Sequence, residues 1–564
     1  MKIFSKYGSI SLYTWLATIT TLLVAGVLAQ VVTNDLAWDD PYLITDVPSL
    51  GNPSQLWTML TVPFWQNSSY TSAQLVDLWR PLTTLFLWLG AFFWGNSPAG
   101  FHMLSLACLA AAATAFARLI AKLTTPMAGP NHKNQVAFAV ALLFAIHPLS
   151  VEVLCMAANM SDHLTFAFMI TQIMLILHYF ENPRSKIKLL WIALLGLLAC
   201  SSKELGVVSA GAPLAAWMLH RSLNATFELK QLKKPLLWTA TITPVIFYLA
   251  LRTVIIKNSG STLTFSADSD FSPLVAFLGF GQALYHSIIP VPSGAHYYIL
   301  PTDPIAIGLS TAVFILLLLI VIRGVKNKKT ISLELTGVIL ALLVLVPSFV
   351  GIKLFALGYK FPARYFHLSL AGFLIAATPF IAKHWAQKIK LIILLTVALL
   401  SLLSFVRINQ WQNTISLFAA EIDYHPDSAI DHINLSQALI NKGAFTNAKK
   451  VLLNFDKLNI TKTKPSIAMR NCAMSRIALY LDNDADKATL LIEKALKAFP
   501  AKLDFVIQLA NIRSFAGHPE QAVIILNKAQ KAPWFIGFQK KEIDKHLTFY
   551  KKLLNHKTNL PKKQ

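Results

Sequence analysis

Charged side chains are scarce in this chain of 564 residues. Only 14% of the residues are Asp, Glu, Lys or Arg, whereas 55% are hydrophobic. Soluble globular proteins carry roughly 25% charged residues. This shortage excludes an ordinary soluble protein, and the long apolar runs between the charges indicate an integral membrane protein.

Acidic residues and cysteines are also few. Against 50 Lys and Arg there are 27 Asp and Glu, which gives a formal net charge of +23. The basic residues lie mostly between apolar runs, as the positive-inside rule predicts, so this excess does not indicate binding to nucleic acid. The cysteines show no paired spacing, so they predict neither disulfides nor a redox compartment. They are Cys108, Cys155, Cys200 and Cys472. Phosphate-loop, nucleophile-elbow and zinc-protease motifs are absent from the sequence.

The apolar runs predict about eleven membrane-spanning helices. The first covers residues 9–32, after Lys2 and Lys6. The others lie near 100–123, 135–155, 162–181, 188–202, 205–220, 235–256, 304–323, 331–351, 366–383 and 389–407. Because every turn placed in the cytoplasm is basic, the C-terminus is expected outside. The runs 81–95, rich in Trp and Phe, and 271–290 are interpreted as interfacial helices, with a true span as the alternative for the second.

From Asn409 onward the composition becomes that of soluble helices. Pro500 and Pro533 lie 33 residues apart, close to the tetratricopeptide period of about 34 residues. We therefore expect an all-α protein with a membrane catalytic domain at 1–408 and an extracytoplasmic, tetratricopeptide-like repeat domain at 409–564. A generic helical bundle is the alternative for the second domain. Stacked repeats form concave peptide-binding faces, so this domain is expected to bind an acceptor protein, or to act only as a stabilising cap.

Two adjacent carboxylates, Asp39 and Asp40, follow the first apolar run in the external segment 34–99. A solvated turn before Pro41 is the simplest interpretation of the pair. However, further ionisable residues lie at the external ends of other spans, where charges usually mark a functional site or pair internally. These are Arg80, His102, His147, Glu152, Asp162, His163, Lys203, Glu204 and Arg364.

The mixture of acids and bases indicates a chemistry. A carboxylate can take the proton of an acceptor hydroxyl, and Arg and Lys bind phosphate. Together they predict a transferase whose leaving group is a phosphate at the membrane surface. Singly, each residue has a structural explanation: Arg80 can anchor a helix, Lys203 and Glu204 can form a solvated loop, and isolated histidines are usually core residues. A metal site is another interpretation of part of the set, but its members lack ligand spacing. They are His147, Glu152, Asp162 and His163.

Six short motifs in order carry a resemblance to a family. Trp38-Asp39-Asp40 resembles the paired-acid motif of GT-C glycosyltransferases, and is most similar to the transmembrane-and-tetratricopeptide O-mannosyltransferases and their bacterial relatives. The other five motifs are Trp79-Arg80-Pro81-Leu82, Gly100-Phe101-His102-Met103, the run 144–152 (FAIHPLSVE), Ser202-Lys203-Glu204-Leu205-Gly206 and Ala363-Arg364-Tyr365-Phe366. One departure is Asn159-Met160-Ser161-Asp162, where the family often has a basic residue.

The resemblance implies a GT-C fold and an inverting transfer from a polyprenyl-phosphate-linked sugar to a hydroxyl of an exported protein, with a pilin as one candidate. It places the reaction outside the cytoplasm, in a bacterial inner membrane. Asp39 or Asp40 would be the base, and Arg80, Lys203 and Arg364 would hold the lipid phosphate. The cavity would be lined by His102, His147, Glu152, Asp162, Glu204 and Tyr365. No cofactor is implied with certainty, because members of this superfamily differ in their use of a divalent metal.

Three alternatives remain at this level. The same chemistry can serve a lipid or polysaccharide acceptor. A transporter or flippase would show internal repeat symmetry and charges near the bilayer midplane, which the sequence does not show. A noncatalytic assembly scaffold would tolerate alanine at both members of the acidic pair.

Overall fold

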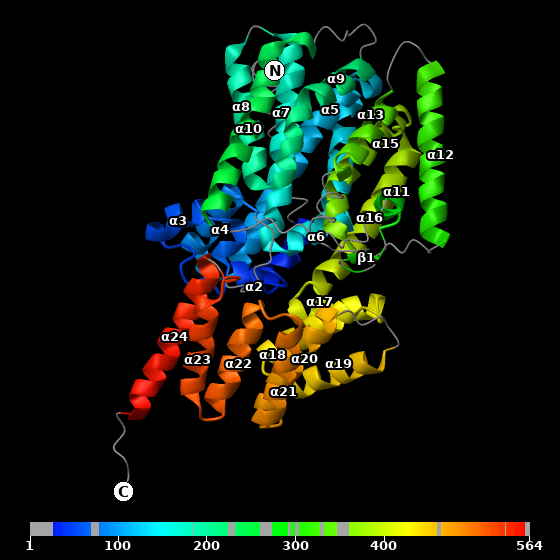
Figure 1. Cartoon of the computed structure of the whole chain (residues 1–564). Helices are drawn as coiled ribbons and strands as arrows, with labels where there is room; N and C mark the ends of the chain where they lie inside the picture. The colour runs from blue at the N-terminus through cyan, green and yellow to red at the C-terminus, as the bar shows by residue number, and fades with distance from the viewer. Residues whose placement is uncertain are drawn as a thin grey trace. The chain divides into compact units, whose positions relative to one another are not determined.

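The structure is a computed structural model that describes most of the chain in two compact units (Figure 1). The described residues are 26–68, 78–183, 185–223, 232–259, 273–290, 294, 296–298, 304–326, 332–346, 360–458, 464–535 and 537–558. The membrane unit comprises Met1–Phe64, Leu78–Ile255 and Phe265–Gln412, and the repeat unit comprises Trp65–Asp77, Ile256–Thr264 and Asn413–Gln564. The units divide between Gln412 and Asn413, whereas the sequence predicts a boundary after residue 408.

Short helices dominate the segment between the first and second predicted spans. They are η1 (Ala29–Thr33), α2 (Asp40–Leu43), η2 (Pro53–Gln55), α3 (Leu56–Leu60), η3 (Phe64–Asn67) and α4 (Pro81–Trp94). Helix α4 has Pro81 as its first residue, where the missing amide proton costs nothing. Its 14 residues reach about 21 Å, less than the roughly 30 Å of a hydrocarbon core. Most of the first predicted span lies outside the described residues.

Five helices among the described residues are long and apolar enough to cross a membrane. These are Pro98–Ala128 within α5 (Pro98–Ile146), Ala157–Glu181 formed by η4 (Ala157–Asn159) and α7 (Met160–Glu181), α10 (Pro235–Asn258), Ala363–Lys383 formed by η7 (Ala363–Phe366) and α15 (His367–Lys383), and α16 (Gln387–Gln410). A sixth candidate joins His132–Ile146 to α6 (Pro148–Cys155) across a 54° bend. An integral membrane protein is supported, but the expected eleven spans are not confirmed.

The predicted span 205–220 is not one continuous α-helix. After α8 (Lys186–Ser202) the chain forms the 3-10 helix η5 (Glu204–Gly211) and then α9 (Ala212–Leu223). Gly206 allows this turn, because a Cβ there would lie 2.3 Å from the carbonyl of Ala199 on α8. The consequence is that Lys203 and Glu204 lie at a tight junction between two helices.

The remaining elements of the membrane unit are α11 (Pro273–Ile288), α12 (Pro304–Lys326), α13 (Leu333–Leu343) and two strands, β1 (His296–Tyr298) and β2 (Lys360–Pro362). The strands pair antiparallel, with Tyr297 opposite Phe361. The all-α expectation therefore holds apart from this small ribbon, which leads directly into the 3-10 helix η7 that carries Arg364.

Paired helices make up the repeat unit (Figure 1). They are α17 (Thr414–Tyr424), α18 (Ala429–Asn441), α19 (Phe445–Lys457), α20 (Lys464–Tyr480), α21 (Ala485–Ala498), α22 (Leu503–Phe515), α23 (Pro519–Lys531) and α24 (Gly537–Thr558). Three successive pairs are α18 with α19, α20 with α21, and α22 with α23. The second helix of each pair buries an alanine and the residues four and seven positions after it. These triplets are Ala448, Leu452 and Phe455; Ala488, Ile492 and Ala495; and Ala522, Leu526 and Ala529.

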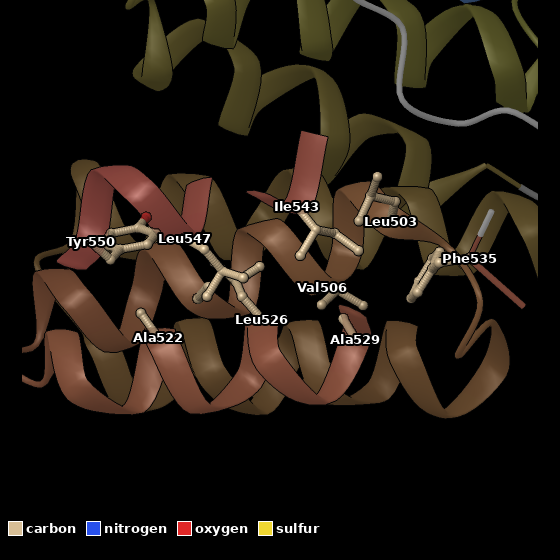
Figure 2. Close-up of a cluster of buried hydrophobic side chains, with 10 residues drawn as sticks. Leu503, Val506, Ala522, Leu526, Ala529, Phe535, Ile543, Leu547 and Tyr550 are labelled. Atoms are coloured by element: carbon tan, nitrogen blue, oxygen red, sulfur yellow. The ribbon is translucent and has the colours of Figure 1, made fainter. Parts of the chain in front are cut away.

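The last of these triplets packs in a cluster with α22 and α24 (Figure 2). Leu526 contributes from α23, Leu503 and Val506 from α22, and Ile543 and Leu547 from α24. The small alanines allow the paired helices to approach closely, and apolar burial of this kind stabilises a stack in which each pair contacts its neighbours.

Candidate functional site

Asp40 is buried and bound to the start of another helix. One carboxylate oxygen accepts a hydrogen bond from the Ala157 amide at 2.7 Å, and the other accepts from the Ala158 amide at 2.9 Å. Burial raises the pKa of Asp40 to about 7, although these two amide donors act in the opposite direction. Because both oxygens are engaged at the N-terminus of η4, Asp40 connects the external loop to the span Ala157–Glu181.

Asp39 has a different environment. It precedes α2, is partly exposed, and its side chain makes no capping hydrogen bond within the described loop. Burial raises the pKa of Asp39 to about 6, while the positive charges of Arg364 and Arg80 lower it. The two members of the acidic pair thus have different surroundings, and Asp39 is the one whose pKa the charges of Arg364 and Arg80 lower.

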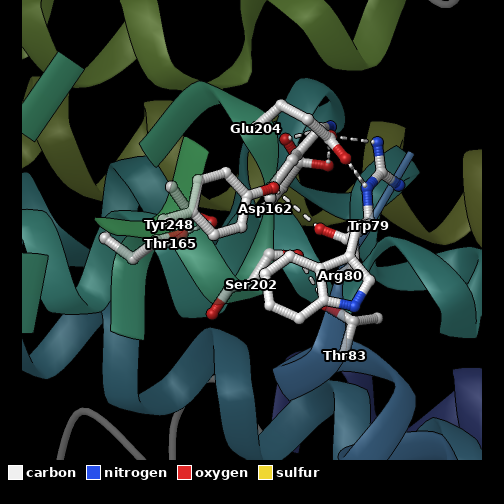
Figure 3. A network of polar contacts seen from close by, with 10 residues as sticks. Trp79, Arg80, Thr83, Asp162, Thr165, Ser202, Glu204 and Tyr248 are labelled. Atoms are coloured by element: carbon white, nitrogen blue, oxygen red, sulfur yellow. Dashed lines mark hydrogen bonds and ion pairs between the residues drawn. The ribbon is translucent and has the colours of Figure 1, made fainter. Parts of the chain in front are cut away.

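Two of the predicted phosphate-binding cations are held by carboxylates (Figure 3). The Arg80 guanidinium donates from Nε at 2.9 Å and from Nη2 at 2.8 Å to Oε2 of Glu204. The Lys203 ammonium donates to both oxygens of Asp162, at 2.7 and 2.6 Å. Burial lowers the pKa of Lys203, and the charge of Asp162 opposes that shift. Each pair is therefore close to neutral as a unit.

Arg364 is held by aromatic rings. Its guanidinium lies 5.3 Å from the ring centroid of Trp38 and 5.7 Å from that of Tyr365. The Lys203 ammonium lies 5.9 Å from the same Tyr365 ring. Nη1 of Arg364 is buried and has no hydrogen-bond partner among the described residues, so these residues leave one donor of this cation unsatisfied.

Hydrogen bonds from neighbouring helices hold Arg80 and Lys203 in place (Figure 3). The Tyr248 hydroxyl on α10 donates to the carbonyl of Trp79 at 2.7 Å, and the two rings stack with centroids 5.5 Å apart. The Thr83 hydroxyl on α4 donates to the carbonyl of Ser202 at 2.7 Å. Tyr248 was not predicted from the sequence, where it is one aromatic residue within an apolar run.

Among the other predicted residues, Glu152 lies close to Arg364, whose charge and backbone amide act on its carboxylate. Glu152 on α6 pairs with Arg407 on α16 at 3.0 Å, and both side chains are buried. His102 contacts the carbonyl of Asp35 at 3.3 Å through Nε2. Nδ1 of His147 accepts from the Leu149 amide at 3.2 Å, which caps α6.

His163 packs edge-on against His367, with ring centroids 5.0 Å apart. Within the part of the chain that the structure describes, no group of three His, Cys, Asp or Glu residues is arranged to hold a metal ion. The possible ligand set of His147, Glu152, Asp162 and His163 is therefore not assembled there.

Comparison with known proteins gives a relative among curated sequences. No family model matches the chain. The chain is 25% identical over 436 residues to a protein O-mannosyl-transferase of Caenorhabditis elegans. The resemblance to protein O-mannosyltransferases is confirmed. The match covers 75% of this chain, and the chain spans only 60% of the length of that curated relative.

Two solved structures are similar at a lower level. ArnT from Cupriavidus metallidurans, bound to undecaprenyl phosphate, is 11% identical with a TM-score of 0.34, and the match covers 97% of this chain and 88% of ArnT. Yeast Tom70 is 14% identical with a TM-score of 0.22, covering 78% of this chain and 96% of Tom70. At these scores neither match establishes a shared fold.

Proposed function

We propose that the chain is a membrane glycosyltransferase that moves a sugar from a polyprenyl-phosphate-linked donor to a hydroxyl of an exported protein, on the extracytoplasmic side. The observation that carries this proposal is a partly exposed carboxylate, Asp39, under the influence of Arg364 and Arg80. An acid that accepts a proton, next to cations that bind phosphate, suits transfer from a phosphate leaving group.

Asp39 is the base in this proposal. The acceptor hydroxyl gives its proton to Asp39 while its oxygen bonds to the anomeric carbon, and the bond from that carbon to the phosphate oxygen breaks. The electron pair leaves with the polyprenyl phosphate. Attack opposite to the leaving group inverts the anomeric centre. Asp40 is less suited to this role because both its oxygens already accept backbone hydrogen bonds.

The three cations have different roles toward the phosphate in this proposal. The lipid-linked donor is a phosphodiester with one negative charge, and its departure as a monoester adds further charge. The buried Nη1 of Arg364 has no hydrogen-bond acceptor among the described residues. Arg364 would therefore bind the phosphate of the lipid-linked sugar. Arg80 and Lys203 are each paired with a carboxylate, so they would offer oriented N–H groups rather than a net positive charge as charge develops on the leaving oxygen.

A protein acceptor is proposed because the curated relative is named a protein O-mannosyl-transferase. The repeat unit would receive this acceptor, and a pilin remains one candidate. Mass spectrometry of envelope proteins from cells with and without the protein identifies the acceptor. A change confined to lipids or polysaccharides would contradict a protein acceptor.

The test of the base is a comparison of two conservative substitutions in the same loop. We expect Asp39→Asn to lower transfer from a lipid-linked sugar by about 100-fold or more, since a general base contributes 10²–10⁴-fold. Asp46→Asn is the matched control, because Asp46 is exposed on the same loop and its loss leaves the site intact. Full activity of Asp39→Asn in purified, folded protein would exclude Asp39 as the base.

A further inference from the structure

A chain of stacked cations and rings lies directly beside Asp39. The ring of Trp411, just after α16, stacks on Trp38 with centroids 5.9 Å apart and planes 25° apart. Arg364 lies 5.3 Å from the Trp38 ring, and Arg407 lies 5.8 Å from the Trp411 ring. We call these four residues the tryptophan stack. It joins a cation of the proposed site to the end of the last described span.

Trp38 has a strained backbone at this point. Its φ is +59°, and among the described residues Asn483 is the other non-glycine with a positive φ. A bulky side chain rarely adopts this conformation, which persists where surrounding contacts over-determine it. Because Trp38 directly precedes Asp39, rotation about the Trp38 backbone would redirect the Asp39 carboxylate.

Several hydrogen bonds fix the end of α16, which supports Trp38. Arg407 donates to Glu152 at 3.0 Å and to Gln410 at 2.9 Å. The external loop is tied to the same place, because the Asn34 side chain donates to the carbonyl of Ile408 at 2.8 Å. The Asp35 amide also donates to the carbonyl of Gln412 at 2.8 Å. Trp411 itself is fully buried. The loop and the helix end therefore form one rigid support for Trp38.

We propose that Trp38 and Trp411 are positioning residues, which hold Asp39 and Arg364 in a fixed relation so that base and phosphate ligand meet the same donor. This inference rests on the proposed function and deepens it. A cation is attracted to the face of an aromatic ring, and two indoles stack through their faces. The proposal therefore requires a ring at position 411, whereas simple apolar packing requires only volume.

The test compares Trp411→Phe with Trp411→Leu in the purified full-length protein. Both keep an apolar side chain, but only Phe keeps a ring. We expect Trp411→Phe to retain activity within about fivefold, the worth of a weakened ring contact. We expect Trp411→Leu to lose about 100-fold in kcat/KM, as misplacement of reacting groups by about 1 Å does. Its kcat/KM profile should also shift along the pH axis, because the distance between Asp39 and Arg364 changes.

Trp57→Leu is the matched control, because Trp57 is 75% exposed and outside the stack. It should behave as the wild type in all these measurements. Equal activity and equal pH profiles of Trp411→Phe and Trp411→Leu would overturn the proposal, since a merely structural contact would need only the apolar volume.

Circular dichroism tests the stack without relying on activity. Two stacked indoles give an exciton couplet, which should disappear in Trp411→Phe and persist in Trp57→Phe. If the wild type shows this couplet but transfers no sugar from any lipid-linked donor, the proposed function fails and the positioning role fails with it, although the stack exists. If Trp411→Phe leaves the spectrum unchanged, the stack is absent and the positioning role is overturned whatever the activity.

Discussion

Adjacent residues with the same side chain can serve different purposes when their surroundings differ. Both carboxylate oxygens of Asp40 accept hydrogen bonds from the amides of Ala157 and Ala158. Asp39 is partly exposed, and the charges of Arg364 and Arg80 lower its pKa. Burial alone would keep Asp39 protonated to a higher pH, and the two positive charges counteract this effect. The result is a pKa of about 6 for Asp39, so the carboxylate form predominates at pH 7, as a general base requires.

This balance predicts the pH dependence of the reaction and its response to loss of a charge. Since the pKa of Asp39 is about 6, kcat/KM in the wild type should rise as the pH increases through about 6. Arg364→Gln removes a charge that lowers this pKa, so the rise should move to higher pH, in addition to weaker donor binding.

Lys388→Gln removes one positive charge from an exposed site near the start of α16 and should leave the profile unchanged. The measurement is kcat/KM against pH for the three proteins. A profile of Arg364→Gln that stays in place or moves to lower pH would contradict the proposed electrostatic balance.

The sequence singles out some residues of the proposed site and leaves others unmarked. The acidic pair and the three cations stand out because charges are rare near apolar runs. The choice between Asp39 and Asp40 depends on amides of Ala157 and Ala158, more than a hundred residues away. No pattern around position 39 contains that information. Arg407 and Trp411 were not singled out either, because their partners lie at distant positions in the chain.

At the scale of elements, the end of α16 depends on an ion pair. Glu152 and Arg407 are almost completely buried, with 3% and 2% of their side chains exposed. A charge left without its partner in such a place is costly, and breaking a buried pair destabilises a protein by about 3–5 kcal/mol.

Glu152→Leu should therefore lower the unfolding temperature in detergent markedly. The double variant Glu152→Leu with Arg407→Leu should recover part of the loss, since no unpaired charge remains buried. The loss in the double variant can be compared with the sum of the losses in Glu152→Leu and Arg407→Leu. If the two are equal, the residues act independently and the ion pair does not explain their burial.

The repeat helices offer a second prediction at this scale. Leu526 and Ile524 lie two residues apart on α23, but Leu526 is fully buried in the cluster of Figure 2 and Ile524 is 65% exposed. Leu526→Ala should cost about 2–5 kcal/mol of stability, because it leaves a cavity. Ile524→Ala should cost less than about 0.5 kcal/mol. Chemical or thermal unfolding followed by circular dichroism measures both, and similar losses would contradict the packing.

For the whole molecule, the hydrophobic composition predicted an integral membrane protein, and the 33-residue spacing of Pro500 and Pro533 predicted the helical repeats. Apolar runs identified helices such as α7, α10 and α16, and alanines such as Ala448, Ala488 and Ala522 marked the repeats. The number of spans was harder to predict, because mean hydropathy does not distinguish a continuous helix from a broken one. The run 205–220 illustrates this, since a close approach at Gly206 produces a 3-10 helix followed by α9.

The account as a whole assigns one reaction to one cluster of charges in the membrane unit. Asp39, Arg80, Lys203 and Arg364 come from four separate segments, and charge effects link them. Each cation has a partner that restrains it, which favours a preorganised phosphate site over a solvated surface. The consequence is that lipid phosphate should be both a product and a ligand of this protein.

The most direct measurement incubates the purified protein with a panel of polyprenyl-phosphate sugars and candidate acceptor proteins, and follows free polyprenyl phosphate and glycosylated acceptor together. The account predicts that the wild type releases both in equal amounts with at least one donor, while Asp39→Asn releases both about 100-fold or more slowly. Equal release by Asp39→Asn, or no release by folded wild type across the panel, would contradict it.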